Sequence, residues 1–163
     1  MVKKIQSIPI SKYESPSAFE GDETLSRVNI PDGVTHIGDK AFKDCTNLSR
    51  IVIPDSVTSI GKNAFGLCKS LKSVVLPDSI THIGDSAFCA CISLSQVKLS
   101  DSIESIGNDA FCQCFSLSSI TLPDKLISIG QGAFADCDSL SESFSEKLHT
   151  RFGKKLFERY FRL

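Results

Sequence analysis

A strict repeat of 23 residues runs through most of this chain of 163 residues. Leu, Gly, an Ala-Phe pair and Cys each return at that interval, and no insertion breaks the phase over five units. The columns are Leu25, Leu48, Leu71, Leu94, Leu117 and Leu140; Gly38, Gly61, Gly84, Gly107 and Gly130; Phe42, Phe65, Phe88, Phe111 and Phe134; and Cys45, Cys68, Cys91, Cys114 and Cys137. Self-similarity at such a period predicts units that stack, each touching only its neighbours.

The first half of each unit is predicted to contain a strand, a turn and a second short strand. With the first Leu as position 1, the pattern is L-x-x-[IV]-x-[IL]-P-D-x-[VIL]-x-x-I-G-x-x-A-F-x-x-C-x-x. Apolar positions 4 and 6 flank an outward position 5, which is the alternation of a strand. Pro at position 7, which only the fourth unit replaces with Ser100, ends that strand because it cannot donate to a ladder.

The second half of each unit is predicted to form a short helix. We expect the Gly at position 14 to supply a backbone angle that other residues resist. Three of the five residues at position 15 are Asp or Asn and could cap a helix. Ala, Phe and Cys at positions 17, 18 and 21 would then share one face of one or two helical turns. Eight inward positions in each of five units supply about 40 core residues, which stacking joins into one core.

The pattern resembles the BspA-like class of leucine-rich repeats. The resemblance covers residues 25–139 fully and the flanks weakly, and the sequence lacks the Asn ladder of the commoner leucine-rich repeat. It implies an α/β fold, a right-handed leucine-rich-repeat solenoid (horseshoe) whose 23-residue units contain strand, turn, short strand and short helix. It also implies roles in adhesion or protein recognition, often at cell surfaces.

The flanks are predicted to cover the two ends of the core. Residues 1–24 form a degenerate N-terminal capping repeat, because Ala18–Phe19 lies in phase with the Ala-Phe pairs and Val2 and Ile5 match positions 1 and 4. Residues 25–139 are the five leucine-rich repeats. Residues 140–163 form a C-terminal capping repeat with a helix, since Phe152–Gly153 and Leu156–Phe157 are also in phase.

The C-terminal helix is predicted from an apolar stripe that recurs every four residues. Ser143 and Glu146 could form its capping box. The stripe comprises Phe144, Leu148, Phe152, Leu156 and Tyr160, and the basic residues between are Lys147, Arg151, Lys154, Lys155, Arg159 and Arg162. Such a segment could bind an anionic membrane or a partner groove. The in-phase residues favour a capping helix with a solvated outer face.

The sequence contains no catalytic constellation, so we expect no enzyme activity, cofactor or metal site. His36 and His82 both occupy position 12 but lie two units apart, too far to chelate a metal together. Phosphate-binding, nucleophile-elbow and zinc-protease motifs are absent. The column Asp32, Asp55, Asp78, Asp101 and Asp124 could suggest calcium, but one Asp beside each Pro is more typical of a turn.

The cysteines allow two interpretations. Thiols stacked at position 21 would lie near disulfide distance, and the C-x-C pairs at 89–91 and 112–114 could hold zinc. The favoured interpretation is that position 21 requires a small buried apolar residue, which Cys provides. Position 19 carries Lys43 and Gly66 in other units, so Cys89 and Cys112 are predicted to be exposed.

The net charge and the hydropathy of the chain argue against nucleic-acid and membrane partners and predict where the protein is located. The net charge is −1, which gives no overall basic field to recruit nucleic acid. No stretch of 18 apolar residues is present, so a membrane partner is not expected. No apolar run of a secretory signal follows Lys3 and Lys4, which predicts a cytoplasmic location, or the cell surface if this is a fragment of a longer chain.

The predicted function is a non-catalytic protein–protein interaction module for recognition or adhesion, which presents a concave β-sheet surface. The alternative is a structural or self-associating repeat protein, a fragment of a longer cell-surface array. The outward strand positions are Arg27, Asn29, Arg50, Val52, Ser73, Val75, Gln96, Lys98, Ser119 and Thr121. Arg27 and Arg50 share one column, and an acidic partner group would relieve their repulsion. A second candidate contact, for a weak homo-oligomer, lies on the convex side at Cys89, Ile92, Cys112 and Phe115.

Overall fold

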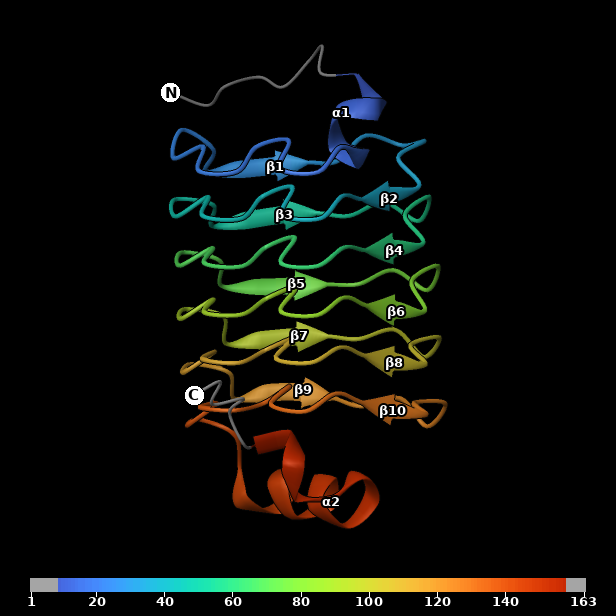
Figure 1. Cartoon of the computed structure of the whole chain (residues 1–163), viewed down its shortest axis with the longest axis vertical. Helices are drawn as coiled ribbons and strands as arrows, with labels where there is room; N and C mark the ends of the chain where they lie inside the picture. Colours follow the sequence, from blue (N-terminus) through green and yellow to red (C-terminus); the bar gives the residue numbers. More distant parts are fainter. Residues whose placement is uncertain (1–8, 158–163) are drawn as a thin grey trace.

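The computed structural model describes residues 9–157, which form a stack of parallel coils (Figure 1). The longer strands are β1 (Arg27–Asn29), β3 (Arg50–Val52), β5 (Ser73–Val75), β7 (Gln96–Lys98) and β9 (Ser119–Thr121). The shorter strands are β2 (His36–Ile37), β4 (Ser59–Ile60), β6 (His82–Ile83), β8 (Ser105–Ile106) and β10 (Ser128–Ile129). Strands of neighbouring repeats pair in parallel with Val28 opposite Ile51, 23 residues on. The predicted solenoid of 23-residue leucine-rich repeats is thereby confirmed.

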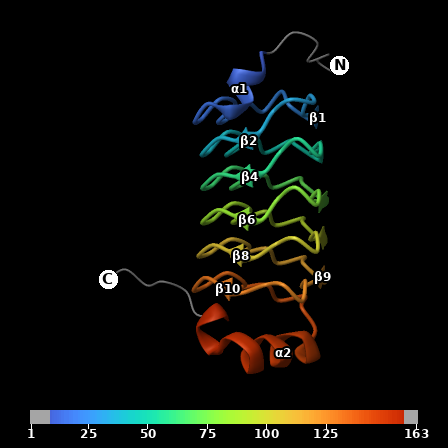
Figure 2. The same cartoon turned by 90° about the vertical axis from the view of Figure 1, so that its right-hand side faces the viewer.

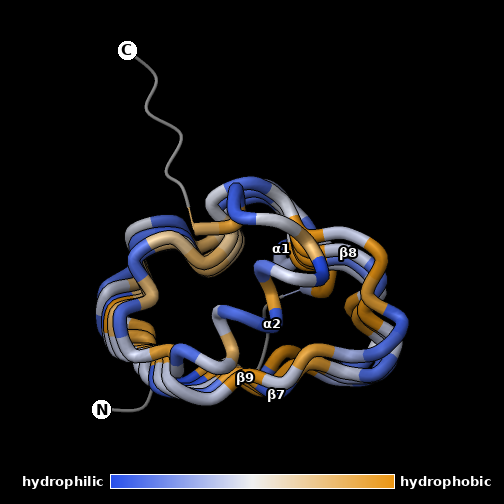
Figure 3. The backbone as a smooth tube through the Cα atoms, turned by 90° about the horizontal axis from the view of Figure 1, so that it is seen from below, coloured by the Kyte–Doolittle hydropathy of each residue, from blue (hydrophilic) through white to orange (hydrophobic). Residues whose placement is uncertain are grey.

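The core is a column of stacked side chains inside the coils. Seen along the stack, successive coils superimpose on one closed outline (Figure 3). The five Phe side chains of the repeats have no exposed surface, and neighbouring ring centroids lie 5.1–5.6 Å apart with planes within 2–11°. Neighbouring repeats are therefore related by an almost pure translation. Figures 1 and 2 show that the stack is nearly straight, so the face formed by the longer strands, here the long-strand face, is close to flat and not concave as predicted.

The segment predicted as a short helix forms two consecutive turns in each repeat, so that part of the prediction was wrong. In the second repeat Asn63 and Leu67 adopt left-handed φ angles of 53° and 62°. A helix cannot pass through two left-handed residues four positions apart. The Phe65 and Leu67 amides donate instead to Ala87 and Cys89 oxygens of the next repeat, each at 2.8 Å. The spacing of Ala, Phe and Cys correctly identified the side of this segment that faces the core, but it did not identify the path of the backbone.

The Gly at position 14 is needed for close approach of neighbouring coils rather than for an unusual φ. The described glycines with positive φ are Gly21, Gly33, Gly132 and Gly153, and none belongs to the column. A Cβ on Gly84 would lie 2.7 Å from the carbonyl carbon of Gly61 in the preceding repeat. Real side chains do not tolerate such a contact, so the predicted reason for this glycine was wrong.

The N-terminal flank packs its aromatic residues onto the first repeat. Helix α1 (Ile10–Glu14) buries Tyr13, whose backbone oxygen accepts from the Gly38 amide at 3.2 Å. The ring of Phe19 stacks on Phe42 at 5.0 Å and 12°, which extends the Phe column by one member. Val2 and Ile5, which were also assigned to this unit, lie outside the described residues.

The C-terminal flank places a helix across the last repeat (Figure 1). Helix α2 (Glu142–Phe152) begins after Ser141, whose hydroxyl accepts from the Phe144 amide, so the capping box predicted at Ser143 and Glu146 was wrong. The short 3₁₀ helix η1 (Lys154–Phe157) follows and buries Leu156, whose oxygen accepts from the Phe134 amide at 3.0 Å. Tyr160, Arg159 and Arg162 lie outside the described residues.

Arg151 fixes the end of helix α2 to the fifth repeat. Its guanidinium Nη2 donates to the backbone oxygens of Asp124 and Leu126, both at 2.8 Å. The same group lies over the ring of Phe152, with 4.8 Å from Cζ to the ring centroid. One of the basic residues of this flank therefore serves the contact between helix and solenoid.

Candidate protein-interaction surfaces

The long-strand face presents two outward side chains from every longer strand. Each of the five strands has an exposed, a buried and again an exposed residue. Across the paired strands, Arg27 lies opposite Arg50, and Val75 lies opposite Lys98. All ten predicted positions are therefore exposed to solvent, in columns that run along the stack.

The strand ladder of this face is interrupted once. Strands β1 and β3 form one sheet, and β5, β7 and β9 form another, whereas the five shorter strands form one continuous sheet. Within residues 9–157, no backbone hydrogen bond of a ladder joins β3 to β5. The repeats on either side follow the same sequence pattern, so this interruption could not be predicted from the sequence.

A groove of about 510 Å³ lies where the ladder is interrupted. Val52 and Val75, with 42% and 60% of their surface exposed, give it an apolar lining. Arg50 and Lys72 contribute positive charge, and Asp55 contributes a single negative charge. Within residues 9–157, neither Arg27 nor Arg50 forms an ion pair or a side-chain hydrogen bond. The long-strand face thus combines this apolar groove, which we call the β3–β5 groove, with two uncompensated guanidinium groups. Arg50 lines the groove, and Arg27 lies opposite Arg50 on the next strand.

The second candidate contact is smaller than predicted. Ile92 and Phe115 occupy the same position in neighbouring repeats and are 40% and 41% exposed. Cys112 is only 7% exposed and Cys89 is half-buried, so the prediction that both thiols are exposed was wrong. Lys43 at the equivalent position reaches outward to Glu20 at 3.1 Å, whereas a short Cys side chain stays against its turn.

The position-21 cysteines are buried hydrogen-bond donors. The thiol of Cys91 donates to the backbone oxygen of Phe65 in the preceding repeat at 3.1 Å, and the other four make the equivalent bond at 3.1–3.2 Å. Burial raises the pKa of Cys45 and of Cys137 to about 12. These thiols therefore stay protonated at neutral pH, which suits a structural role and disfavours metal binding.

We expect the fully reduced, metal-free protein to fold as completely as the untreated one. The buried Cys column already has its hydrogen bonds, and within residues 9–157 no three His, Cys, Asp or Glu side chains are grouped to hold a metal. Thermal unfolding with and without a chelator and a reductant measures this. A decrease in the melting temperature of more than a few degrees with either reagent would contradict the prediction.

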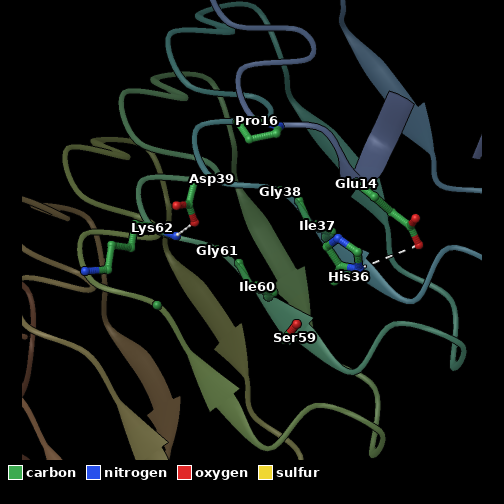
Figure 4. Close-up of a pocket in the computed structure, with 11 residues that line it drawn as sticks. Glu14, Pro16, His36, Ile37, Gly38, Asp39, Ser59, Ile60, Gly61 and Lys62 are labelled. Atoms are coloured by element: carbon green, nitrogen blue, oxygen red, sulfur yellow. Dashed lines mark hydrogen bonds and ion pairs between the residues drawn. The ribbon is translucent and has the colours of Figure 1, made fainter. Parts of the chain in front are cut away.

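The shorter strands border a second groove, of about 440 Å³ (Figure 4). There Glu14 accepts from the amide and the hydroxyl of Thr35, both at 2.9 Å, and these bonds lower the pKa of the Glu14 carboxyl. His36 Nδ1 lies 3.7 Å from Glu14 Oε1. The carboxylate of Asp39 accepts from the Lys62 amide at 2.7 Å. These groups connect the N-terminal flank and neighbouring repeats.

The Asp39 contact corrects the role predicted for position 15. Asp85 accepts from the Asn108 amide, and Asn108 in turn accepts from the Gln131 amide, both at 2.9 Å. These side chains therefore link consecutive repeats and do not cap helices. The polar side chains of Asp39, Asp85 and Asn108 thus give their coils a second connection beside the backbone ladder.

Parallel coils of 23 residues, a Phe column and exposed longer strands define a leucine-rich-repeat solenoid. The chain belongs to the family of the BspA type leucine rich repeat region, whose model matches residues 10–141 and 58–163 with six copies. This family is compatible with roles in protein interaction or adhesion. No protein with a curated description matches the chain. Within residues 9–157, no helix is both long and apolar enough to cross a bilayer.

Solved bacterial structures share the fold. A leucine-rich repeat protein of T. pallidum is 30% identical over 88% of this chain and 78% of its own, with a TM-score of 0.69. A leucine rich cell surface protein of Faecalibacterium prausnitzii is 37% identical over 77% of this chain but 34% of its own, with a TM-score of 0.67. The pneumococcal vaccine antigen PcpA, 19% identical over 89% of this chain and 38% of its own, has a TM-score of 0.51 and shares the fold alone.

Proposed function

We propose that this chain is a non-catalytic recognition module that binds a protein partner on its long-strand face. The observation that carries the proposal is the β3–β5 groove, where the ladder is interrupted. There the facing backbone groups of β3 and β5 are not bonded to each other, although the two strands remain neighbours. An extended segment of a partner would therefore lie across the outward face, where the groove and the exposed side chains around it give specificity.

The chemistry of the groove favours an acidic, partly apolar segment. Arg27 and Arg50 lie side by side, and like charges on neighbouring strands repel each other mildly. A carboxylate of the partner would relieve this repulsion, and Arg is enriched among residues that dominate binding energy. Val52 and Val75 would contact apolar side chains of the same segment. The description of the F. prausnitzii relative as a cell surface protein favours recognition at a bacterial surface over the cytoplasmic location expected from the sequence.

A random peptide library displayed on phage would test the groove. We expect the selected peptides to be rich in Asp or Glu beside apolar residues. Arg27→Glu together with Arg50→Glu should then weaken their binding about tenfold or more, because each substitution replaces attraction with repulsion. Fluorescence anisotropy with the labelled peptide measures the Kd. Both arginines are exposed, so the melting temperature should stay unchanged.

Two controls define the outcome. Lys125→Glu with Lys147→Glu changes the net charge equally at exposed sites outside the groove and should preserve binding. Phe115→Ser should also preserve it. If instead Phe115→Ser abolishes binding while the double arginine variant retains it, the site lies at Ile92 and Phe115 and the present proposal is wrong.

The exposed pair Ile92 and Phe115 favours self-association as a second candidate function. Two apolar side chains on neighbouring repeats could meet the same pair of a second copy. Light scattering over a concentration series would detect the dimer, and Phe115→Ser should then restore the monomer. A monomer at every concentration would exclude this function.

A further inference from the structure

Cys89 and Cys112 lie at the same position of the third and fourth repeats. The Ala90 amide donates to the backbone oxygen of Cys112 at 2.7 Å, so the two turns are directly hydrogen-bonded. The rings of Phe88 and Phe111 in the same two repeats lie 5.4 Å apart, with planes only 2° apart. Because the repeats are related by translation, the two Cys Cα atoms lie about that far apart, within the range of roughly 4.4–6.8 Å found in disulfides.

The two thiols also contact each other and differ from the other cysteines. A hydrogen bond between the thiols lowers the pKa of Cys89, whereas that bond and burial raise the pKa of Cys112. Cys89 is half-buried and reachable from solvent, in contrast to the fully buried thiols of Cys68 and Cys91. A reactive cysteine is typically an accessible one with an increased thiolate fraction. Cys89 is the accessible member of the pair, so it is the thiol that an oxidant reaches first.

The repeat pattern does not require this pair. Position 19 carries Lys43, Gly66 and Ala135 in the other repeats, so the solenoid folds with several side chains there. In the position-21 column, by contrast, each thiol makes a hydrogen bond to a Phe carbonyl oxygen. The thiols of Cys89 and Cys112 therefore remain available for chemistry.

We propose that Cys89 and Cys112 form a reversible disulfide that links the third and fourth repeats when a peroxide is present. The Cys89 thiolate attacks one peroxide oxygen, which gives a sulfenic acid and, after protonation, a water molecule. The Cys112 sulfur then attacks the sulfenic sulfur, the S–S bond forms, and the hydroxyl leaves as a second water. The two thiols lose two electrons, which the peroxide takes up. A dithiol reductant reverses the step by thiol–disulfide exchange.

The geometry makes this disulfide easy to reduce. Cβ atoms related by translation keep the same spacing as their Cα atoms, whereas a disulfide brings them to about 3.8 Å. The two turns must therefore approach each other by roughly 1–2 Å when the bond forms. Strained disulfides have more oxidising potentials and are the labile ones, which suits a reversible link.

Mass spectrometry can test the proposal on the whole chain. The folded protein is treated with hydrogen peroxide, remaining thiols are blocked with N-ethylmaleimide after denaturation, and trypsin separates the two cysteines by cleavage after Lys98. We expect a cross-linked pair of peptides in which fragmentation places the bond at Cys89 and Cys112. The pair should disappear on treatment with a dithiol and in Cys89→Ser.

A variant with the same number of thiols provides the matched control. Gly66→Cys with Cys89→Ser separates the two position-19 thiols by two repeats. The three atoms nearest to a Cβ on Gly66 belong to Asn63, the nearest at 3.2 Å. We expect no cross-link in this variant, because about twice the repeat spacing exceeds disulfide reach. The proposal is overturned if the oxidised wild-type protein lacks the bond between Cys89 and Cys112, or if the control variant forms a cross-link equally well.

Discussion

Gly84→Ala is expected to destabilise the solenoid by about 3 kcal/mol or more. The added Cβ would lie 2.7 Å from the Gly61 carbonyl carbon and 2.8 Å from its oxygen, both of them backbone atoms. Gly61 directly follows strand β4 and its amide donates to the Ile37 oxygen, so these atoms cannot move without disturbing the hydrogen bonds between repeats. Urea denaturation followed by circular dichroism measures the loss of unfolding free energy.

Gly66→Ala is the matched control in the second repeat. The three atoms nearest to a Cβ there all belong to Asn63. The nearest is its side-chain oxygen at 3.2 Å, which can move, and its backbone oxygen lies at an ordinary 3.4 Å. We expect the unfolding free energy to change by less than about 0.5 kcal/mol. Equal stability of Gly84→Ala and the wild-type protein would contradict the close approach of coils described above.

Deletion of residues 141–163 is expected to make the chain aggregate. Leu148 and Leu156 are buried against the last repeat, and the ring of Phe144 meets Phe134 edge-on at 6.1 Å. Removal of the flank exposes Phe134 and leaves its amide without the Leu156 oxygen. An open apolar end of a solenoid is a surface for association. Size-exclusion chromatography with light scattering measures the loss of monomer.

Single substitutions in the whole chain separate capping from other roles of this flank. Leu148→Asp should reproduce the aggregation, because a buried side chain becomes charged. Lys147→Asp, next to it on the exposed side of α2, should leave the protein monomeric. If the truncated protein stays monomeric and equally stable, residues 141–163 form a free ligand-binding or membrane segment.

The solenoid could be predicted from the sequence because the same residue types recur at the same positions of every repeat. The column of Phe residues identified the core, and the alternation around Val28 identified which strand residues face outward. The backbone conformation of the turns was harder to predict from the sequence than the residues of the core. The left-handed Leu67 carries no signal in its residue type, and apolar spacing in a turn can imitate a helix.

The candidate site was predictable only in part. The outward strand positions followed from periodicity, but the interruption between β3 and β5 did not, since both repeats carry the same pattern. The burial of Cys112 depends on how its short side chain packs against the turn. The presence of Lys43 at position 19 did not show that a Cys there is exposed. A long Lys side chain extends from the turn into solvent, whereas a short Cys side chain stays packed against the turn.

Because neighbouring repeats such as those of Phe88 and Phe111 are related by a nearly pure translation, the length of the solenoid is proportional to the number of its repeats. Each added or deleted unit of 23 residues changes its length by 5.1–5.6 Å and rotates the units beyond it only slightly. The outward columns would stay aligned in a longer or shorter chain. The long-strand face can therefore change in length while each repeat still presents its own outward side chains. Insertion of a partial unit inside a coil would break the register of both strand ladders at once.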